Sequence, residues 1–326
     1  NGYDAVYQPD WIDDELETPP YKTRMFYKYD RKLFRFKVDL QGKLAGDHFR
    51  WITGWNFQNF KIAEVNLDKL NKNKEGDEVL PEVDGLYQLY QDWGLISGDE
   101  VDGGFVPTFK GGLVFDTRDN RPNPMKGIWT EAVVEASPKI LGAESSFAKL
   151  SLIHRQYFTL VPRNLSLVYR LAYQTTLAGD VPFYYQSQVI TSILTGALSE
   201  GLGGAKTQRG VLRNLVVGDG FFYGNLEARW KFVRFNFIKN NFYLGLNGFA
   251  DFGRVTKKID FTLPANLGTY SKADFFKDDA EKFHTSVGAG LRIAMNENFV
   301  IAVDYGRALN EQDGKSGMYI GLNYLF

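Results

Sequence analysis

Hydrophobic and polar residues alternate along this chain in segments of about ten residues. The segment around residue 226 shows the pattern most clearly. One face of it carries Phe222, Gly224, Leu226, Ala228, Trp230 and Phe232, and the other carries Tyr223, Asn225, Glu227, Arg229 and Lys231. A period of two residues is typical of a β-strand with two different faces. This segment is therefore predicted to be a strand.

The same alternation recurs within residues 34–41, 165–174, 285–293 and 299–305. Extended along the chain, it predicts twelve strands, over residues 21–29, 32–46, 50–64, 105–118, 126–137, 146–161, 164–178, 219–234, 241–256, 283–295, 297–308 and 315–326. The apolar face switches from odd to even positions between Tyr29 and Phe34. A turn at Asp30-Arg31 or a β-bulge would produce this switch.

The composition favours a membrane barrel over a soluble sheet. Aromatic residues make up 15% of the chain, yet its mean hydropathy is −0.29. A transmembrane barrel has this balance because apolar side chains face lipid and polar ones face the lumen. No segment reaches the ~18 apolar residues of a spanning helix. We therefore expect an all-β fold, a transmembrane antiparallel β-barrel of about 12 strands.

Short and long connections alternate along the predicted barrel. The long ones cover residues 65–104, 179–218 and 257–282. Because bacterial barrels have short periplasmic turns and long extracellular loops, both chain ends are expected in the periplasm. Residues 1–20 then form a periplasmic N-terminal lead-in, and residues 21–326 form the barrel. Within loop 65–104, an aromatic patch at residues 86–96 is either a short helix over the barrel mouth or a partner site.

Several chemistries are excluded or disfavoured. The net charge is −1, which argues against nucleic acid as a partner, and the chain has no cysteine. Its three histidines are far apart, and adjacent carboxylates such as Asp99 and Glu100 have no nearby His or Ser in the sequence. These carboxylates are best interpreted as solvated loop charges. We expect no enzyme activity, no catalytic residue, no bound metal and no cofactor.

Five short motifs follow one another in a fixed order over residues 111–326. They are Asp116-Thr117-Arg118-Asp119 with Pro124 and Gly127, Gln208-Arg209-Gly210, Gly224-Asn225-Leu226-Glu227, Phe249 to Val255, and Ser286 to Arg292 followed by Asp304-Tyr305-Gly306. In this order they resemble the barrels of BamA-type outer-membrane insertases and two-partner secretion transporters, the bacterial surface antigen barrels. The first hundred residues show no such resemblance.

The resemblance implies a loop-lock inside the barrel. Loop 179–218 would fold inward, and Arg209, beside Gly210, would pair with Glu227 and Asp251. Alternation independently points both carboxylates into the lumen, where an arginine can form charge-assisted contacts with them. The alternative is that the three are ordinary lumen charges. Val211 stands where the family usually has an aromatic residue, so the resemblance does not extend to stacking there.

The last six residues, with Gly321, Tyr324 and Phe326, are similar to the end that such barrels use as their own assembly signal. A terminal aromatic residue is alternatively a plain interfacial anchor. The family usually carries periplasmic POTRA domains and has sixteen strands. Twelve strands after a short lead-in therefore suggest a short member without POTRA domains, with sixteen strands as the alternative.

The resemblance implies a barrel in the outer membrane of a Gram-negative bacterium that assists protein insertion or transport, or acts on lipid. Its partners would be outer-membrane lipid, protein clients and accessory periplasmic or outer-membrane proteins. Insertion would need a barrel that opens between its first and last strands, a junction that we call the seam. The first predicted strand is short and charged, so its pairing with residues 315–326 is expected to be weak. The alternative is a structural barrel, a pore or a subunit of a larger complex without insertase activity.

Overall fold

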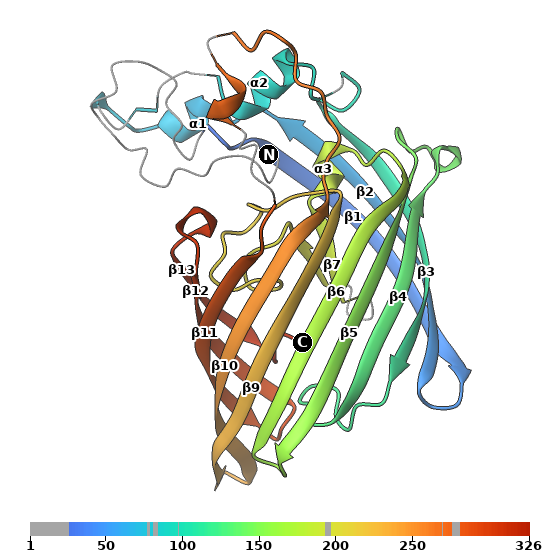
Figure 1. Ribbon diagram of the computed structural model, residues 1–326, viewed down its shortest axis with the longest axis vertical. Coiled ribbons are helices and arrows are strands. Elements are labelled where there is room, and N and C mark those ends of the chain that lie inside the picture. Colours follow the sequence, from blue (N-terminus) through green and yellow to red (C-terminus); the bar gives the residue numbers. More distant parts are fainter. Residues whose placement is uncertain are drawn as a thin grey trace.

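The computed structural model describes residues 26–76, 79–80, 84–96, 98–192, 197–268, 270–275 and 281–326. Eleven strands form one antiparallel sheet that curls into a barrel wall, in the order β1-β2-β3-β4-β5-β6-β9-β10-β11-β12-β13 (Figure 1). The strands are β1 (Asp30–Ala45), β2 (Phe49–Ala63), β3 (Gly103–Asp116), β4 (Gly127–Ser137), β5 (Phe147–Val161), β6 (Leu165–Gly179), β9 (Gly220–Phe237), β10 (Asn240–Lys257), β11 (His284–Met295), β12 (Phe299–Ala308) and β13 (Ser316–Leu322). The prediction of an all-β antiparallel barrel is confirmed.

Each of these eleven strands lies on one of the twelve segments predicted from the sequence. The remaining prediction, residues 21–29, falls partly outside the described residues, and Phe26 to Tyr29 form no strand. The predicted turn at Asp30-Arg31 is wrong, because both residues begin β1 and the chain turns at Phe26 and Tyr27. Phe26 packs against Leu86 and Phe275 outside the wall, so its apolar character does not mark a strand face.

The inside-outside phase predicted from the alternation is confirmed. On β9, the Leu226 side chain is 44% exposed on the outer face, whereas Glu227 is fully buried on the inner one. Leu291 and Ile301 are likewise exposed, and Arg292 and Asp304 are buried. Because successive strand side chains point to opposite faces, a polar lumen and an apolar outer surface follow directly from the sequence.

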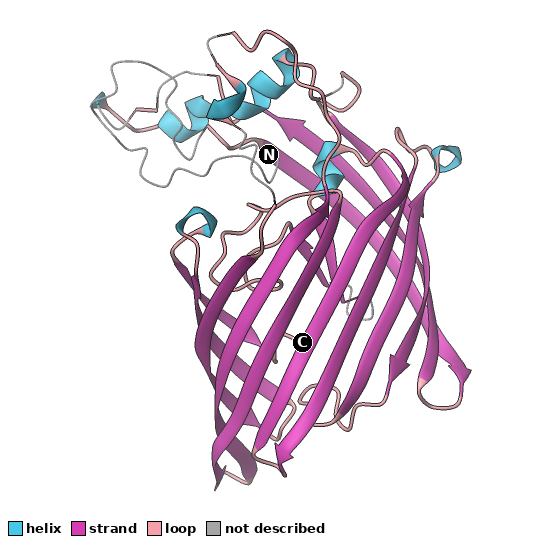
Figure 2. Cartoon of the chain, in the orientation of Figure 1, coloured by secondary structure: helices cyan, strands magenta, loops and turns pink. Residues whose placement is uncertain are grey.

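Loops at one end of the barrel form an aromatic cap. Helix α2 (Leu86–Asp92) buries Leu86 and Leu89 against Phe26, Trp93, Leu267 and Phe275, and these six residues define the cap. Helix α1 (Leu67–Asn71) precedes α2, and both lie beyond the strands (Figure 2). The short 3₁₀ helices are η2 (Lys139–Leu141), η3 (Lys272–Asp274) and η4 (Glu311–Asp313). None of the described helices is both long and apolar enough to cross a membrane.

The connection between β6 and β9 folds into the barrel, as Figure 1 shows, and we call its described residues, 180–192 and 197–219, the inward loop. It contains α3 (Phe183–Gln186) and a hairpin of β7 (Gln188–Ser192) and β8 (Ala197–Glu200). Its apolar residues, including Val189 and Leu202, pack against the inner wall at Ile153 and Phe221. The loop therefore has a small hydrophobic core of its own with the wall.

Strands β1 and β13 are the two edges of the sheet. Ten antiparallel pairings separate them, so the two edges run in the same direction. No pairing between β1 and β13 occurs within the described part of the chain. Closure of bacterial barrels by antiparallel pairing requires an even number of strands, which these eleven do not provide.

Candidate functional site

Arg209 of the inward loop lies at the centre of a buried ion-pair network. Its Nε donates to Asp251 Oδ2 at 2.9 Å and its Nη2 to Asp251 Oδ1 at 2.9 Å, a bidentate pair. Arg209 Nη1 lies 2.8 Å from Glu227 Oε1. The Arg209 side chain is 1% exposed, and both carboxylates are fully buried. The structure thus brings together Arg209, Glu227 and Asp251, as the sequence predicted.

Two partners of Arg209 were missed by sequence reasoning. Arg209 Nη1 lies 3.2 Å from Asp304 Oδ2 on β12. Its guanidinium also stacks 3.4 Å from the ring centroid of Phe249 on β10. Both residues belong to recognised motifs, and the alternation of β12 could have pointed Asp304 inward. The aromatic contact therefore comes from the wall, whereas Val211 of the loop is simply buried.

Further arginines balance the carboxylates around Arg209. Arg229 Nε donates to Glu227 Oε2 at 2.8 Å, and Arg292 donates to both oxygens of Asp304 at 2.7 and 3.0 Å. Three guanidiniums thus face three carboxylates, with near-complete burial. Buried charges are tolerated when they are paired and hydrogen-bonded. The convergence of these groups on Arg209 favours a built lock over scattered lumen charges.

Glycines allow the loop backbone to meet the wall. Gly210 has φ +98°, and a Cβ there would lie 2.8 Å from backbone atoms of Gly306 and Arg307. A Cβ on Gly306 would in turn lie 2.7 Å from the Arg209 carbonyl. The Gly210 N–H donates to the Tyr319 hydroxyl on β13 at 2.9 Å. The role of Gly210 in the lock is therefore close approach to β12, for which Gly306 is the counterpart.

The chain end turns into the lumen instead of completing the last strand. β13 ends at Leu322, and Asn323 has φ +66°. Tyr324 then packs beside Tyr243, and Phe326 packs beside Tyr157 and Val168 on the inner wall. Arg229 Nη2 donates to the Phe326 carbonyl at 3.0 Å. The prediction of a strand to residue 326 is therefore wrong, because inner-wall arginine and aromatic contacts hold these residues.

Those contacts bear on the two interpretations of the terminal residues. Phe326 is 7% exposed, which is incompatible with an anchor at the membrane interface. Gly321 stays in β13 and pairs with Ala302, so the three residues of the predicted assembly signal do not act together in the folded chain. Their role as a signal during assembly stays a prediction.

A smaller arginine site holds the turn between β3 and β4. Arg118 donates from Nε and Nη2 to the two oxygens of Asp116 at 2.9 and 3.1 Å, and its guanidinium lies 3.6 Å from the Trp129 ring centroid. Gly127 has φ +112° and lies against the Thr117 carbonyl. This is the motif that the sequence singled out at residues 116–119. In the structure it is a stacked ion pair that fixes a short turn.

Within the described ranges, no group of three or more His, Cys, Asp or Glu residues could hold a metal ion. The network consists of arginines and carboxylates that are paired with one another and almost fully buried. Its chemistry is structural: it fixes the inward loop to β9, β10 and β12.

Comparisons with known proteins agree with this geometry. BamA from Haemophilus ducreyi lacking POTRA domains 1–3 is similar in structure, with a TM-score of 0.56 and 12% identity over 90% of this chain and 55% of that one. CdiB from Escherichia coli is similar with a TM-score of 0.55 and 13% identity over 90% of this chain and 45% of that one. The chain thus spans about half the length of either structure.

Identities this low establish the likeness of fold alone. A comparison with curated protein sequences finds no match. The Omp85 superfamily domain, however, matches residues 15–326, which is nearly the whole sequence. This β-barrel therefore belongs to the Omp85 superfamily.

Proposed function

We propose that this chain is an outer-membrane β-barrel that assists the insertion or translocation of proteins in a Gram-negative-type bacterium. The observation that carries the proposal is the pair of sheet edges, β1 and β13, which are not paired with each other in the described structure. An edge strand presents unpaired N–H and C=O groups, which can template a strand of another chain. Membership of the Omp85 superfamily supports the same activity.

The outer surface beside both edges suits a client entering lipid. Phe34, Phe36 and Leu40 on β1 are exposed, as are Met318, Ile320 and Leu322 on β13. A client strand paired with either edge would therefore lie in register with lipid-facing side chains. Its backbone would be satisfied by hydrogen bonds, which is the condition for any segment in the hydrocarbon region.

A photo-crosslinking experiment tests the proposal. A photoreactive phenylalanine analogue replaces Phe36 on β1 or Met318 on β13, and the barrel is reconstituted in liposomes with an unfolded eight-stranded outer-membrane protein. We expect faster client folding than in empty liposomes, and client crosslinks from both edge positions. Phe109 on β3 is the matched control, because it is also outward and exposed but lies inside the sheet. Equal crosslinking from Phe109, or no acceleration of client folding, would contradict the proposal.

A structural barrel without insertase activity is the second candidate. The observation that favours it is that the inward loop and the terminal residues occupy the lumen and are bound to its wall. Under this function the same liposomes give no acceleration, and the barrel is recovered with stable partners from native membranes. Under either function, outer-membrane lipid would contact the apolar outer face of the barrel.

A further inference from the structure

The inward loop contacts both halves of the barrel wall. Its first half, residues 183–192 and 197–200, contacts β1, β2, β4 and β6. Its second half, residues 201–219, contacts β6, β9, β10, β12 and β13. The two halves are continuous, whereas strands β1 and β13 are not paired with each other in the part of the chain that the structure describes. The loop therefore links, through the lumen, the two edges of a sheet that is continuous between them through the β6–β9 pairing.

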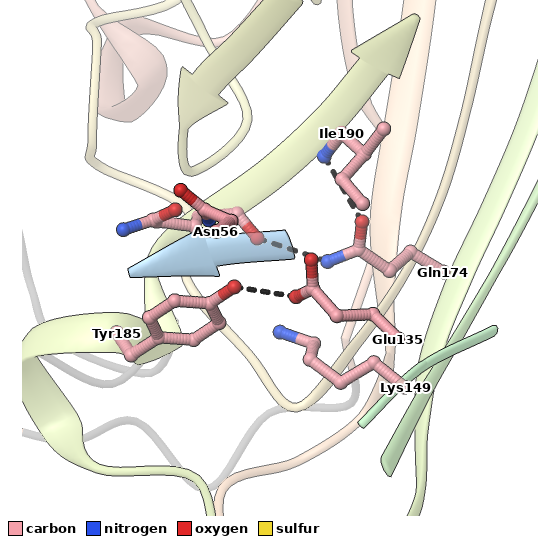
Figure 3. A pocket seen from close by; sticks show the side chains of 7 residues that line it. Asn56, Glu135, Lys149, Gln174, Tyr185 and Ile190 are labelled. Carbon is pink, nitrogen blue, oxygen red and sulfur yellow. Dashed lines mark hydrogen bonds between the residues drawn. The ribbon is translucent and has the colours of Figure 1, made fainter. Parts of the chain in front are cut away.

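The first half of the loop is fastened by polar contacts to β1, β2, β4 and β6. The Tyr185 hydroxyl donates to Glu135 of β4, and the Ile190 N–H donates to Gln174 Oε1 of β6 at 3.0 Å (Figure 3). Gln188 Nε2 donates to Gln58 Oε1 of β2 at 2.7 Å. All of these residues except Gln58 line a cavity of only about 20 Å³, so little space is left between the loop and the wall.

Glu200, at the end of β8, extends the first half to the sheet edge. It forms an ion pair with Arg31 of β1. Its other oxygen accepts from Arg213 Nη2 of the second half at 2.7 Å. Glu200 therefore lies between the edge strand β1 and the part of the loop that holds the opposite wall.

The second half is fastened to the other edge. Arg209 is bound to β9, β10 and β12 through the network described above, and the Gly210 N–H donates to Tyr319 of β13. The Leu212 N–H donates to the Asp313 carbonyl, in the turn between β12 and β13, at 2.8 Å. One peptide segment therefore reaches both the edge strand β13 and its preceding turn.

We propose that the inward loop is a clasp that sets the width of the seam between β1 and β13. This inference rests on the proposed function, and it assigns to the inward loop the control of how far β1 and β13 lie apart. The two halves differ in how they reach the sheet edges. The second half reaches β13 beside a buried network of paired charges. The first half packs Tyr184 and Tyr185 on β2, β3 and β5, but it reaches β1 through one partly buried ion pair at Glu200. When the seam opens, the first half releases β1, and the loop stays with the β13 side.

The test measures the seam without any client. Spin labels are attached to cysteines at Leu40 of β1 and Ile320 of β13, both outward and exposed, in a chain that has no natural cysteine. These positions lie on the strands, away from the aromatic cap, which also spans the seam at the barrel mouth. Pulsed electron spin resonance then gives the distribution of distances between the labels.

Tyr185→Phe combined with Glu200→Gln removes two contacts of the first half and keeps the shapes of both side chains. We expect the label separation to increase, or its distribution to broaden, by about one strand spacing, ~5 Å. Arg234→Gln is the control, because it removes an ion pair with Glu297 on the short-turn side that joins no part of the loop. Labels at Leu113 and Leu152, within the continuous wall, should keep their separation in every variant.

An unchanged distribution in the folded double variant would overturn the clasp. Should that variant fail to fold, the two single substitutions are measured in the same way, and unchanged distributions in both would overturn it equally. The outcome is independent of client folding. If the seam widens but the barrel has no insertase activity, the proposed function is refuted and the clasp is supported. If the barrel is active but the seam does not widen, the clasp is refuted and the proposed function is supported.

Discussion

At the scale of residues, the loop-lock depends on how the negative charges are shared. Glu227 has a second cation in Arg229, and Asp304 has one in Arg292. Asp251 is bound bidentately by the Arg209 guanidinium. It also accepts from the Arg209 backbone N–H at 3.0 Å and from the neutral Asn225 amide at 2.7 Å. Removing Arg209 therefore affects Asp251 most, because a buried carboxylate would lose its bidentate cation.

Arg209→Ala should destabilise the folded barrel by about 3–5 kcal/mol, the usual cost of breaking a buried ion pair from one side. Heat-modifiable mobility on semi-native gels and urea unfolding in micelles measure this loss. Adding Asp251→Asn should recover part of it, since the orphan charge is removed. The control Arg234→Ala removes an ion pair whose residues are partly exposed, and should cost at most about 1 kcal/mol. Equal losses in the two single variants would show that the network is not a structural lock.

At the scale of elements, each strand corresponds to one uninterrupted alternation of apolar and polar residues. Sequence alone located eleven strands because lipid on one side and a polar lumen on the other impose the same period throughout. It failed at residues 26–29 and 323–326, where aromatic residues are present for another reason. Phe26 belongs to the aromatic cap, and Phe326 packs on the inner wall. Neither contact produces an alternating pattern in the sequence.

The two faces of β9 make the phase testable. Leu226→Lys places a charge on the lipid face and should cost roughly 2–4 kcal/mol if the residue lies near the bilayer midplane. The lumen face of the same strand already carries a lysine, Lys231, over the Tyr243 ring, and Lys231→Gln should cost less than Leu226→Lys because no charge is moved into lipid. Folding yield into liposomes and urea unfolding compare the two. A similar loss for both would mean that the assignment of faces is incorrect.

At the scale of the whole molecule, the barrel is a curled sheet whose interior is occupied. The inward loop lies within the lumen and packs on the inner wall, and Tyr324 and Phe326 pack there as well. The aromatic cap joins the loop before β3 to the loop before β11 at the mouth. An occupied lumen conducts ions poorly, because water and ions need a continuous polar path.

In planar bilayers the unmodified protein should therefore show little steady conductance. Replacing residues 184–199 with a short Gly-Ser linker removes the first half of the inward loop and keeps the Arg209 network. This variant should conduct in long-lived steps, provided that it retains the heat-modifiable mobility of a folded barrel. Large, steady conductance of the unmodified protein would argue instead for an open pore.

Sequence reasoning established the all-β fold, eleven strand positions and the outward and inward faces, and the resemblance in motif order implied the pairing of Arg209 with Glu227 and Asp251. These inferences need only the local alternation of residues and the order of the motifs along the chain. The folded structure was needed to show that Asp304 and Phe249 complete the site, that Gly210 packs on Gly306, and that the terminal residues turn inward. It also decided that Glu200 meets Arg31 across 169 residues of chain. Such contacts depend on how the sheet curls and where the loop lies within it, and no local pattern encodes either.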